Sequence, residues 1–194
     1  MPPVNQKAAR QFVRPGRSQF VFHQQARRLD TTLPARLIRA SAAMDWNRQA
    51  RLVFDVPKPE HFGDYRHCCE CAEHDETLSA HDVDSIGLEQ LGNPGWDPLC
   101  FSSAEGLVYY MPALIRITLE TIDSPGEVYL EQLLFHLIQD GEGNRLVSAC
   151  SREQRAFVAD FLEYLADNHG PQIEAGAFTP EHILRAHEIW SAAV

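Results

Sequence analysis

Residues 104–122 have the sequence AEGLVYYMPALIRITLETI, which is apolar on most sides when drawn as a helix. A helix that is apolar nearly all round is buried, so this segment predicts the central helix of a core. Ser102 or Ser103 can cap its start, with Glu105 in the first turn. Pro112 lacks the N–H that would bond to residue 108, so we expect either a kink there or two abutting helices.

Segments on both sides of this helix also show helical spacing of apolar residues, interrupted by proline and glycine. We expect further helices at 45–55, 67–79, 84–91 and 127–139. Another helix should begin after a capping box at Ser151. A last helix should begin at Thr179-Pro180, and its inward-facing residues should be Ile183, Leu184, His187 and Trp190. No strictly alternating run of β-branched residues competes with this pattern. The sequence predicts an all-α fold, a single compact domain of six or seven helices with a kinked central helix.

The chain has 194 residues, of which 44% are hydrophobic and 23% charged, as in an average globular protein. No apolar run approaches the ~18 residues of a membrane span, so we expect no membrane partner. The net charge of −10 is unevenly distributed: residues 1–43 hold eight Lys/Arg and one acidic residue, whereas residues 44–194 hold nine and twenty-six. Because nucleic-acid binding needs basic clusters, we also expect no nucleic-acid partner.

Residues 1–43 form a basic extension that we separate from a helical domain at 44–194. The extension has no apolar core of the kind a secretory signal needs. Three interpretations stay open: a disordered or loosely helical tail, a targeting segment, or extra sequence before a natural start at Met44.

Residues 67–76, HCCECAEHDE, contain three of the five cysteines and two of the nine histidines. If the segment is helical, His67, Cys71 and His74 share one narrow face with Cys68 at its edge, while Cys69 points away. Thiolate and imidazole are the donors that zinc prefers. The sequence therefore predicts a possible zinc site at His67, Cys68, Cys71 and His74, with His61 as a further ligand; His81 and Cys100 are other residues able to complete it.

Other interpretations of this segment stay open. Cysteine is often buried as a small hydrophobe, with neighbouring histidines bonded to backbone carbonyls. Cys68 and Cys71 have the CxxC spacing of redox proteins, but the flanking acidic residues are expected to raise thiol pKa values. A Cys/His nucleophile has no local signature here. Clustered cysteines without a spread disulfide framework favour a reducing compartment, and we expect a cytoplasmic location.

Three motifs carry a resemblance to known proteins. The run at 65–73, YRHCCECAE, the segment YYMPAL at 109–114 and the capped amphipathic segment at 151–165 resemble an uncharacterised family of small bacterial proteins. In that family a Glu-Cys pair precedes a helix and a Tyr-Leu-Pro-Ala segment follows. The resemblance covers residues 44–165, implies a domain of unknown function in a bacterial cytoplasm, and carries no activity. This chain departs from the pattern in its denser cysteine cluster.

Two functions from different classes follow. The first is a non-enzymatic protein-interaction or regulatory domain that binds another protein and holds a structural zinc, because the helical body is acidic and has no phosphate loop or nucleophile elbow. The alternative is a zinc-dependent enzyme using His67, Cys71 and His74, with Glu70 or Glu73 as general base. We expect the first.

Overall fold

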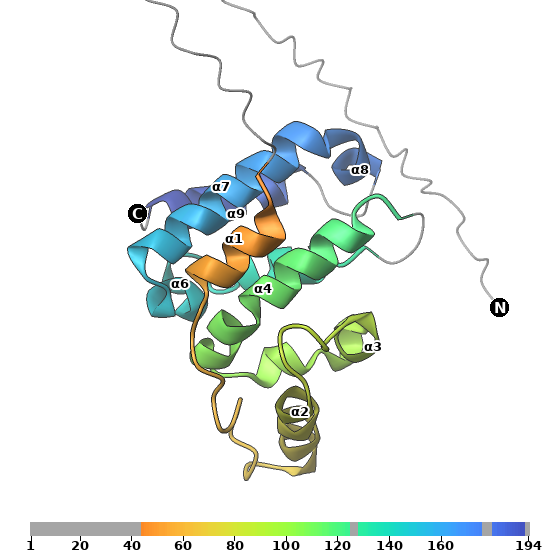
Figure 1. Cartoon of the computed structure of the whole chain (residues 1–194), viewed down its shortest axis with the longest axis vertical. Coiled ribbons are helices and arrows are strands. Elements are labelled where there is room, and N and C mark those ends of the chain that lie inside the picture. Colours follow the sequence, from red (N-terminus) through yellow and green to blue (C-terminus); the bar gives the residue numbers. More distant parts are fainter. Residues whose placement is uncertain (1–43, 125–127, 176–179, 193–194) are drawn as a thin grey trace, which may run out of the picture. The chain divides into compact units, whose positions relative to one another are not determined.

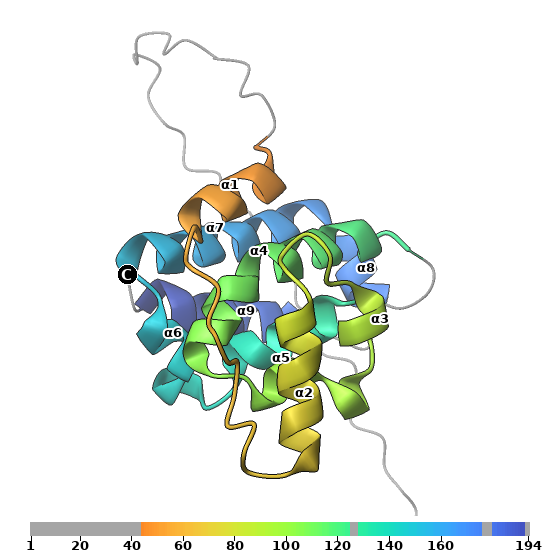
Figure 2. The same cartoon turned by 60° about the horizontal axis from the view of Figure 1, so that its bottom comes forward.

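The computed structural model of the protein describes residues 44–124, 128–175 and 180–192 (Figures 1 and 2). These residues form nine α-helices and three 3-10 turns and contain no strand, which confirms the all-α fold class. The elements are α1 (Trp46–Val53), α2 (Cys69–Ala80), α3 (Leu88–Leu91), η1 (Pro94–Trp96), η2 (Pro98–Phe101), α4 (Ala104–Thr121), α5 (Leu130–Ile138), η3 (Gly141–Gly143), α6 (Arg145–Ala149), α7 (Arg152–Asn168), α8 (Gly170–Ala175) and α9 (Pro180–Ala192). Six of the described α-helices have eight residues or more. The interpretations of residues 1–43 and of Thr179 as a cap lie outside the described residues.

Helix α4 is the central element, buried on most of its surface as its composition predicts. It contacts α1, α5 and α6, and Ser103 caps it by accepting a hydrogen bond from the Gly106 N–H. The helix passes through the buried Pro112 without interruption, so the two abutting helices considered at this position do not form. Figure 1 shows α4 in green as one continuous ribbon.

Helices α7 and α9 pack against each other, and α1 also contacts α7. The Ser151 capping box predicted from the sequence begins α7, with the Ser151 hydroxyl bonded to the Gln154 N–H and the Gln154 side chain bonded to the Ser151 N–H. In α9, Ile183 and Trp190 are buried, but Leu184 is 59% exposed. The expectation that Leu184 faces inward is therefore wrong, because Ala186 and Ile189 complete the inward face instead.

Helices α2 and α3 lie next to each other in both views and both contact η2 (Figures 1 and 2). The Tyr110 hydroxyl of α4 donates to the carbonyls of Leu78 and His81, which fixes the carboxyl end of α2 against the core. The predicted helix at 84–91 is reduced to four residues, because the Asp82 carboxylate holds residues 82–85 in a turn.

No helix among the described residues combines the length and the apolar character needed to cross a membrane.

Candidate metal and thiol site

Helix α2 begins at Cys69, two residues later than predicted. Cys68 is its N-cap and has extended backbone angles, φ −160° and ψ 174°. The Cys68 Sγ accepts a hydrogen bond from the Cys71 N–H at 3.4 Å, as a serine oxygen does at an ordinary N-cap. This geometry turns the Cys68 side chain back over the first turn of the helix and onto Cys71.

Three of the five predicted ligands lie together at this helix start. The Cys68 and Cys71 Sγ atoms are 3.4 Å apart, and the Cys71 Sγ lies 3.6 Å from the His67 Nδ1. The donor atoms of His67, Cys68 and Cys71 all lie within 4.8 Å of one another. His67 and Cys68 are exposed and Cys71 is half-buried, so this group, which could hold a metal ion, opens onto solvent.

The two thiols of this group differ in acidity. Hydrogen bonds lower the pKa of Cys68 to about 7. The largest effect comes from the Cys71 backbone N–H, and smaller effects come from the side chains of His67 and Cys71. The hydrogen bond with Cys68 and partial burial, together with nearby charges including Glu70, raise the pKa of Cys71. The interaction with Cys68 also raises the pKa of His67. The expectation that acidic neighbours raise thiol pKa values does not hold for Cys68, whose pKa is lowered by hydrogen bonds at the helix start.

The segment that carries His67 and Cys68 is fixed to α2 by Asp75, a buried carboxylate. Asp75 accepts hydrogen bonds from the backbone N–H groups of Phe62 at 2.6 Å and Gly63 at 3.2 Å, and it pairs with the His61 Nδ1 at 2.8 Å. Burial raises the pKa of Asp75, but these hydrogen bonds outweigh it, so the pKa lies below its usual value.

His61 does not belong to the ligand group. Its Nδ1 is occupied by Asp75, and its ring stacks on Tyr65 with centroids 4.1 Å apart. The structure therefore does not bring the predicted ligand His61 into the donor group, because the buried Asp75 carboxylate already pairs with its imidazole.

His74 is also outside the group. It is 2% exposed and lies between Trp96 and Phe101, with ring centroids 4.7 and 4.4 Å from its own. Its Nε2 is 3.8 Å from a carboxylate oxygen of Glu70. The prediction assumed that a helix continues back to His67; because the backbone is extended at Cys68, the shared face of His67 and His74 does not exist.

A second group of possible donors, which sequence reasoning missed, consists of Asp97, Cys100 and His136. The Asp97 carboxylate is buried, pairs with the His136 Nε2 at 2.9 Å and accepts from the Leu99 N–H at 2.9 Å. Gln132 donates to the Leu91 carbonyl beside it. A signal was present, because Gln132 and His136 interrupt the apolar face of α5 four residues apart.

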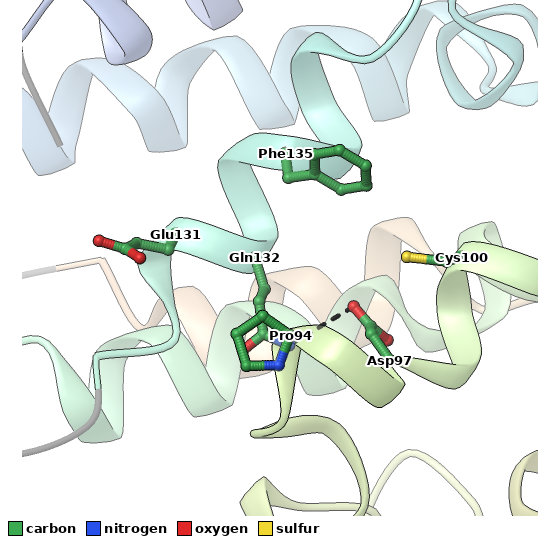
Figure 3. A pocket seen from close by; sticks show the side chains of 6 residues that line it. All are labelled: Pro94, Asp97, Cys100, Glu131, Gln132 and Phe135. Atoms are coloured by element: carbon green, nitrogen blue, oxygen red, sulfur yellow. Dashed lines mark hydrogen bonds between the residues drawn. The ribbon is translucent and has the colours of Figure 1, made fainter. Parts of the chain in front are cut away.

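Asp97 and Cys100 of this second group line a hollow of about 270 Å³. Figure 3 shows Cys100 of η2 and Phe135 of α5 facing it from different elements, with Gln132 turned toward Asp97. Burial, followed by the charge of Asp97, raises the pKa of Cys100 to about 11. In the metal-free protein the Cys100 thiol is therefore neutral at pH 7, which does not suit a nucleophile.

Neither family models nor curated proteins nor solved structures provide a match for this chain. The resemblance to an uncharacterised bacterial family stays a prediction.

Proposed function

We propose that the helical domain is a non-enzymatic protein-interaction or regulatory domain that holds a zinc ion at His67, Cys68 and Cys71. The observation that carries the proposal is the convergence of one imidazole and two thiols within 4.8 Å at the surface. These are donors that structural zinc sites use, and one of the thiols has a pKa of about 7.

The distances between the donors fit a tetrahedral zinc ion. With Zn–S bonds of about 2.3 Å and Zn–N bonds of about 2.05 Å, tetrahedral geometry places two sulfurs about 3.8 Å apart and a sulfur and a nitrogen about 3.6 Å apart. The structure has 3.4 Å between the sulfurs and 3.6 Å between the Cys71 Sγ and the His67 Nδ1. Small rotations of exposed side chains are enough to admit the ion.

A three-donor site at the surface leaves one coordination position open. All three donors come from one short stretch of chain, residues 67–71, and two of them are exposed. A side chain of a partner protein can fill the fourth position, and the acidic surface of residues 44–194 favours a partner with a basic surface. Zinc then joins the two proteins.

The alternative of a zinc-dependent enzyme using His67, Cys71 and His74 has less support. His74 is buried between two aromatic rings, and the hollow of about 270 Å³ is lined by other residues. Two of the three donors at 67–71 are exposed, so water is not excluded from a substrate bound there.

Metal titration of the purified full chain tests the zinc site. We expect one zinc equivalent to bind the reduced, metal-free protein, and Co²⁺ in its place to give the absorption of thiolate-to-cobalt charge transfer. Cys68→Ser and Cys71→Ser should each weaken zinc binding by more than about 100-fold. Loss of a residue that only hydrogen-bonds to a ligand weakens metal binding by about 10–100-fold, so a larger loss indicates a direct ligand. Cys69→Ser is the matched control, because Cys69 is exposed on the same turn and outside the donor group.

Two results would contradict the zinc site: binding weaker than millimolar in the wild type, or equal loss of affinity in Cys69→Ser. The interaction itself is tested by capture of partners on the zinc-loaded chain. We expect the captured protein to be released by chelator and by raised salt, and a partner that ignores both treatments would contradict a zinc-bridged contact.

A further inference from the structure

The two sulfur atoms of Cys68 and Cys71 lie in van der Waals contact, 3.4 Å apart. A disulfide bond needs about 2.05 Å, so the atoms must approach each other by roughly 1.4 Å. Cys68 is exposed and Cys71 is half-buried, so both side chains have room to rotate by this amount. The extended backbone at Cys68 already directs its side chain toward Cys71.

We propose that Cys68 and Cys71 are a thiol–disulfide exchange site, which a low-molecular-weight disulfide oxidises reversibly to an intramolecular disulfide. This activity goes beyond zinc binding and does not require it. The geometry that supports it is the position of Cys68 as N-cap and of Cys71 three residues later, which places an exposed sulfur directly over a less exposed one at a helix start.

The exchange proceeds in two displacements. The Cys68 thiolate, which accepts a hydrogen bond from the Cys71 N–H, attacks one sulfur of the disulfide R–S–S–R. The bond from Cys68 Sγ to this sulfur forms, the S–S bond of the reagent breaks, and R–S⁻ leaves with the electron pair and takes a proton from water.

The second displacement uses Cys71 and His67. The His67 Nδ1, 3.6 Å from the Cys71 Sγ, takes the thiol proton as this sulfur attacks the Cys68 Sγ. The Cys68–Cys71 bond forms, the bond between Cys68 Sγ and the sulfur of R breaks, and the second R–S⁻ leaves with the electron pair and takes the proton held by His67. In total two protein thiols lose two electrons and the reagent is reduced to two R–SH.

The other described cysteines are poorly placed for this reaction. Cys69 follows Cys68 directly, but the sulfur contacts at the helix start join Cys68 and Cys71. Cys100 lies with Asp97 and His136, and Cys150 is 3% exposed. Cys69 therefore serves as the control for proximity alone.

Oxidation and metal binding exclude each other at this site. A disulfide between Cys68 and Cys71 removes two of the three proposed zinc donors, because a metal ion binds thiolates and not the disulfide. A bound zinc ion in turn occupies both sulfurs and protects them from the oxidant.

The test uses the full chain, metal-free, in buffers with varied ratios of glutathione to glutathione disulfide. Intact mass and alkylation of the remaining thiols report the redox state, and the Cys69→Ser variant makes the assignment within residues 67–71 unambiguous. We expect the wild type and Cys69→Ser to lose two thiols and two hydrogens, and to regain them in excess glutathione.

The single variants separate the two displacements. Cys71→Ser should accumulate a mixed disulfide with glutathione at Cys68, because the second displacement is blocked. Cys68→Ser should lose the intramolecular disulfide and carry at least about 10-fold less mixed disulfide at the helix start. The proposal is overturned if the disulfide forms equally in Cys68→Ser, if Cys69 is the partner, or if no mixed disulfide appears in Cys71→Ser.

Failure of this proposal and failure of the zinc proposal give different results. A chain that forms the disulfide but binds no zinc keeps the exchange site and loses the metal site. A chain that binds zinc but stays reduced in glutathione disulfide, after the zinc has been removed, keeps the metal site and loses the exchange site. Circular dichroism of each variant confirms that the helices are retained in both arms.

Discussion

Cys68 and Cys71 are three residues apart, yet their thiols respond to opposite influences. Cys68 receives the hydrogen bond of a free backbone N–H at the helix start, which stabilises its thiolate. Cys71 lies beneath that thiolate and is partly buried, so its own ionisation is opposed. One turn of helix therefore places a sulfur with a lowered pKa next to a sulfur with a raised pKa.

This difference predicts the pH dependence of alkylation in the metal-free protein. Because the pKa of Cys68 is about 7, its thiolate is half formed near neutral pH, and its rate with iodoacetamide should fall as the pH drops below 7. The pKa values of Cys100 and Cys150 are about 11 and about 12, so both should stay unmodified until the pH is strongly alkaline. Mass mapping against pH measures the midpoints, and a Cys68 midpoint near the usual value of about 8.5 would contradict the assignment.

At the scale of elements, Asp75 joins α2 to the segment at 61–68 that supplies two of the three donors. Its carboxylate ties together the N–H groups of Phe62 and Gly63 and the ring of His61. Gly63 approaches η2 so closely that a Cβ at this position would lie 2.5 Å from the Phe101 carbonyl oxygen. The segment thus fits tightly between α2 and η2, and the site depends on that fit.

Asp75→Asn should lower the free energy of unfolding at pH 7 by about 1–3 kcal/mol, because an amide nitrogen replaces the carboxylate oxygen that pairs with His61, and the oxygen that accepts from Phe62 and Gly63 loses its charge. The pKa of Asp75 is lowered in the folded state, so its contribution is complete above the unfolded pKa of about 3.9 and is lost as the pH falls through the folded value. Urea unfolding should therefore show wild type and variant converging in acid.

The control for this prediction is Asp64→Asn. Asp64 is exposed on the same segment and accepts a hydrogen bond from the Arg66 N–H at 3.3 Å, so its loss should cost less than about 0.5 kcal/mol. Equal destabilisation by the two variants at pH 7, or a difference that persists in acid, would show that Asp75 does not fix the segment in this way.

The elements themselves were largely predictable, whereas the partners of individual side chains were not. Caps, prolines and apolar stripes act over a few residues, which is why the sequence predicts the bounds of α4 and the cap of α7 closely. The start of α2 was misplaced by two residues, because Cys as an N-cap is an uncommon signal. Because of this difference His67 lies outside the helix and shares no helical face with His74.

Contacts distant in the sequence explain the rest. The positions of His61 and His74 depend on Asp75 and on the rings of Trp96 and Phe101, and no local pattern encodes them. The pair of Asp97 and His136 spans 39 residues. Periodicity predicts which face of a helix is buried, but it does not predict which polar group of a distant segment contacts that face.

At the scale of the whole described domain, α5 is the element where distant parts of the chain meet through buried polar contacts. Gln132 donates to the Leu91 carbonyl, His136 pairs with Asp97, and the Trp190 Nε1 of α9 donates to the Leu137 carbonyl at 3.0 Å. Each contact satisfies a polar group that burial would otherwise leave without a partner. Together they fix η2, and with it the support of α2, relative to α9.

His136→Ala should therefore destabilise the whole domain and not only its own surroundings. Removing the imidazole leaves the Asp97 carboxylate buried without its closest side-chain partner, and breaking a buried pair in this way costs about 3–5 kcal/mol.

Phe135→Ala is the matched control, because Phe135 is the preceding residue of α5 and is 47% exposed, so we expect a loss below about 1 kcal/mol. Urea unfolding followed by circular dichroism and by tryptophan fluorescence should give one shared transition for His136→Ala, since Trp96, next to Asp97, and Trp190 lie on the two sides that this network joins. Separate transitions, or a cost equal to that of Phe135→Ala, would mean that α5 does not couple the two sides of the domain.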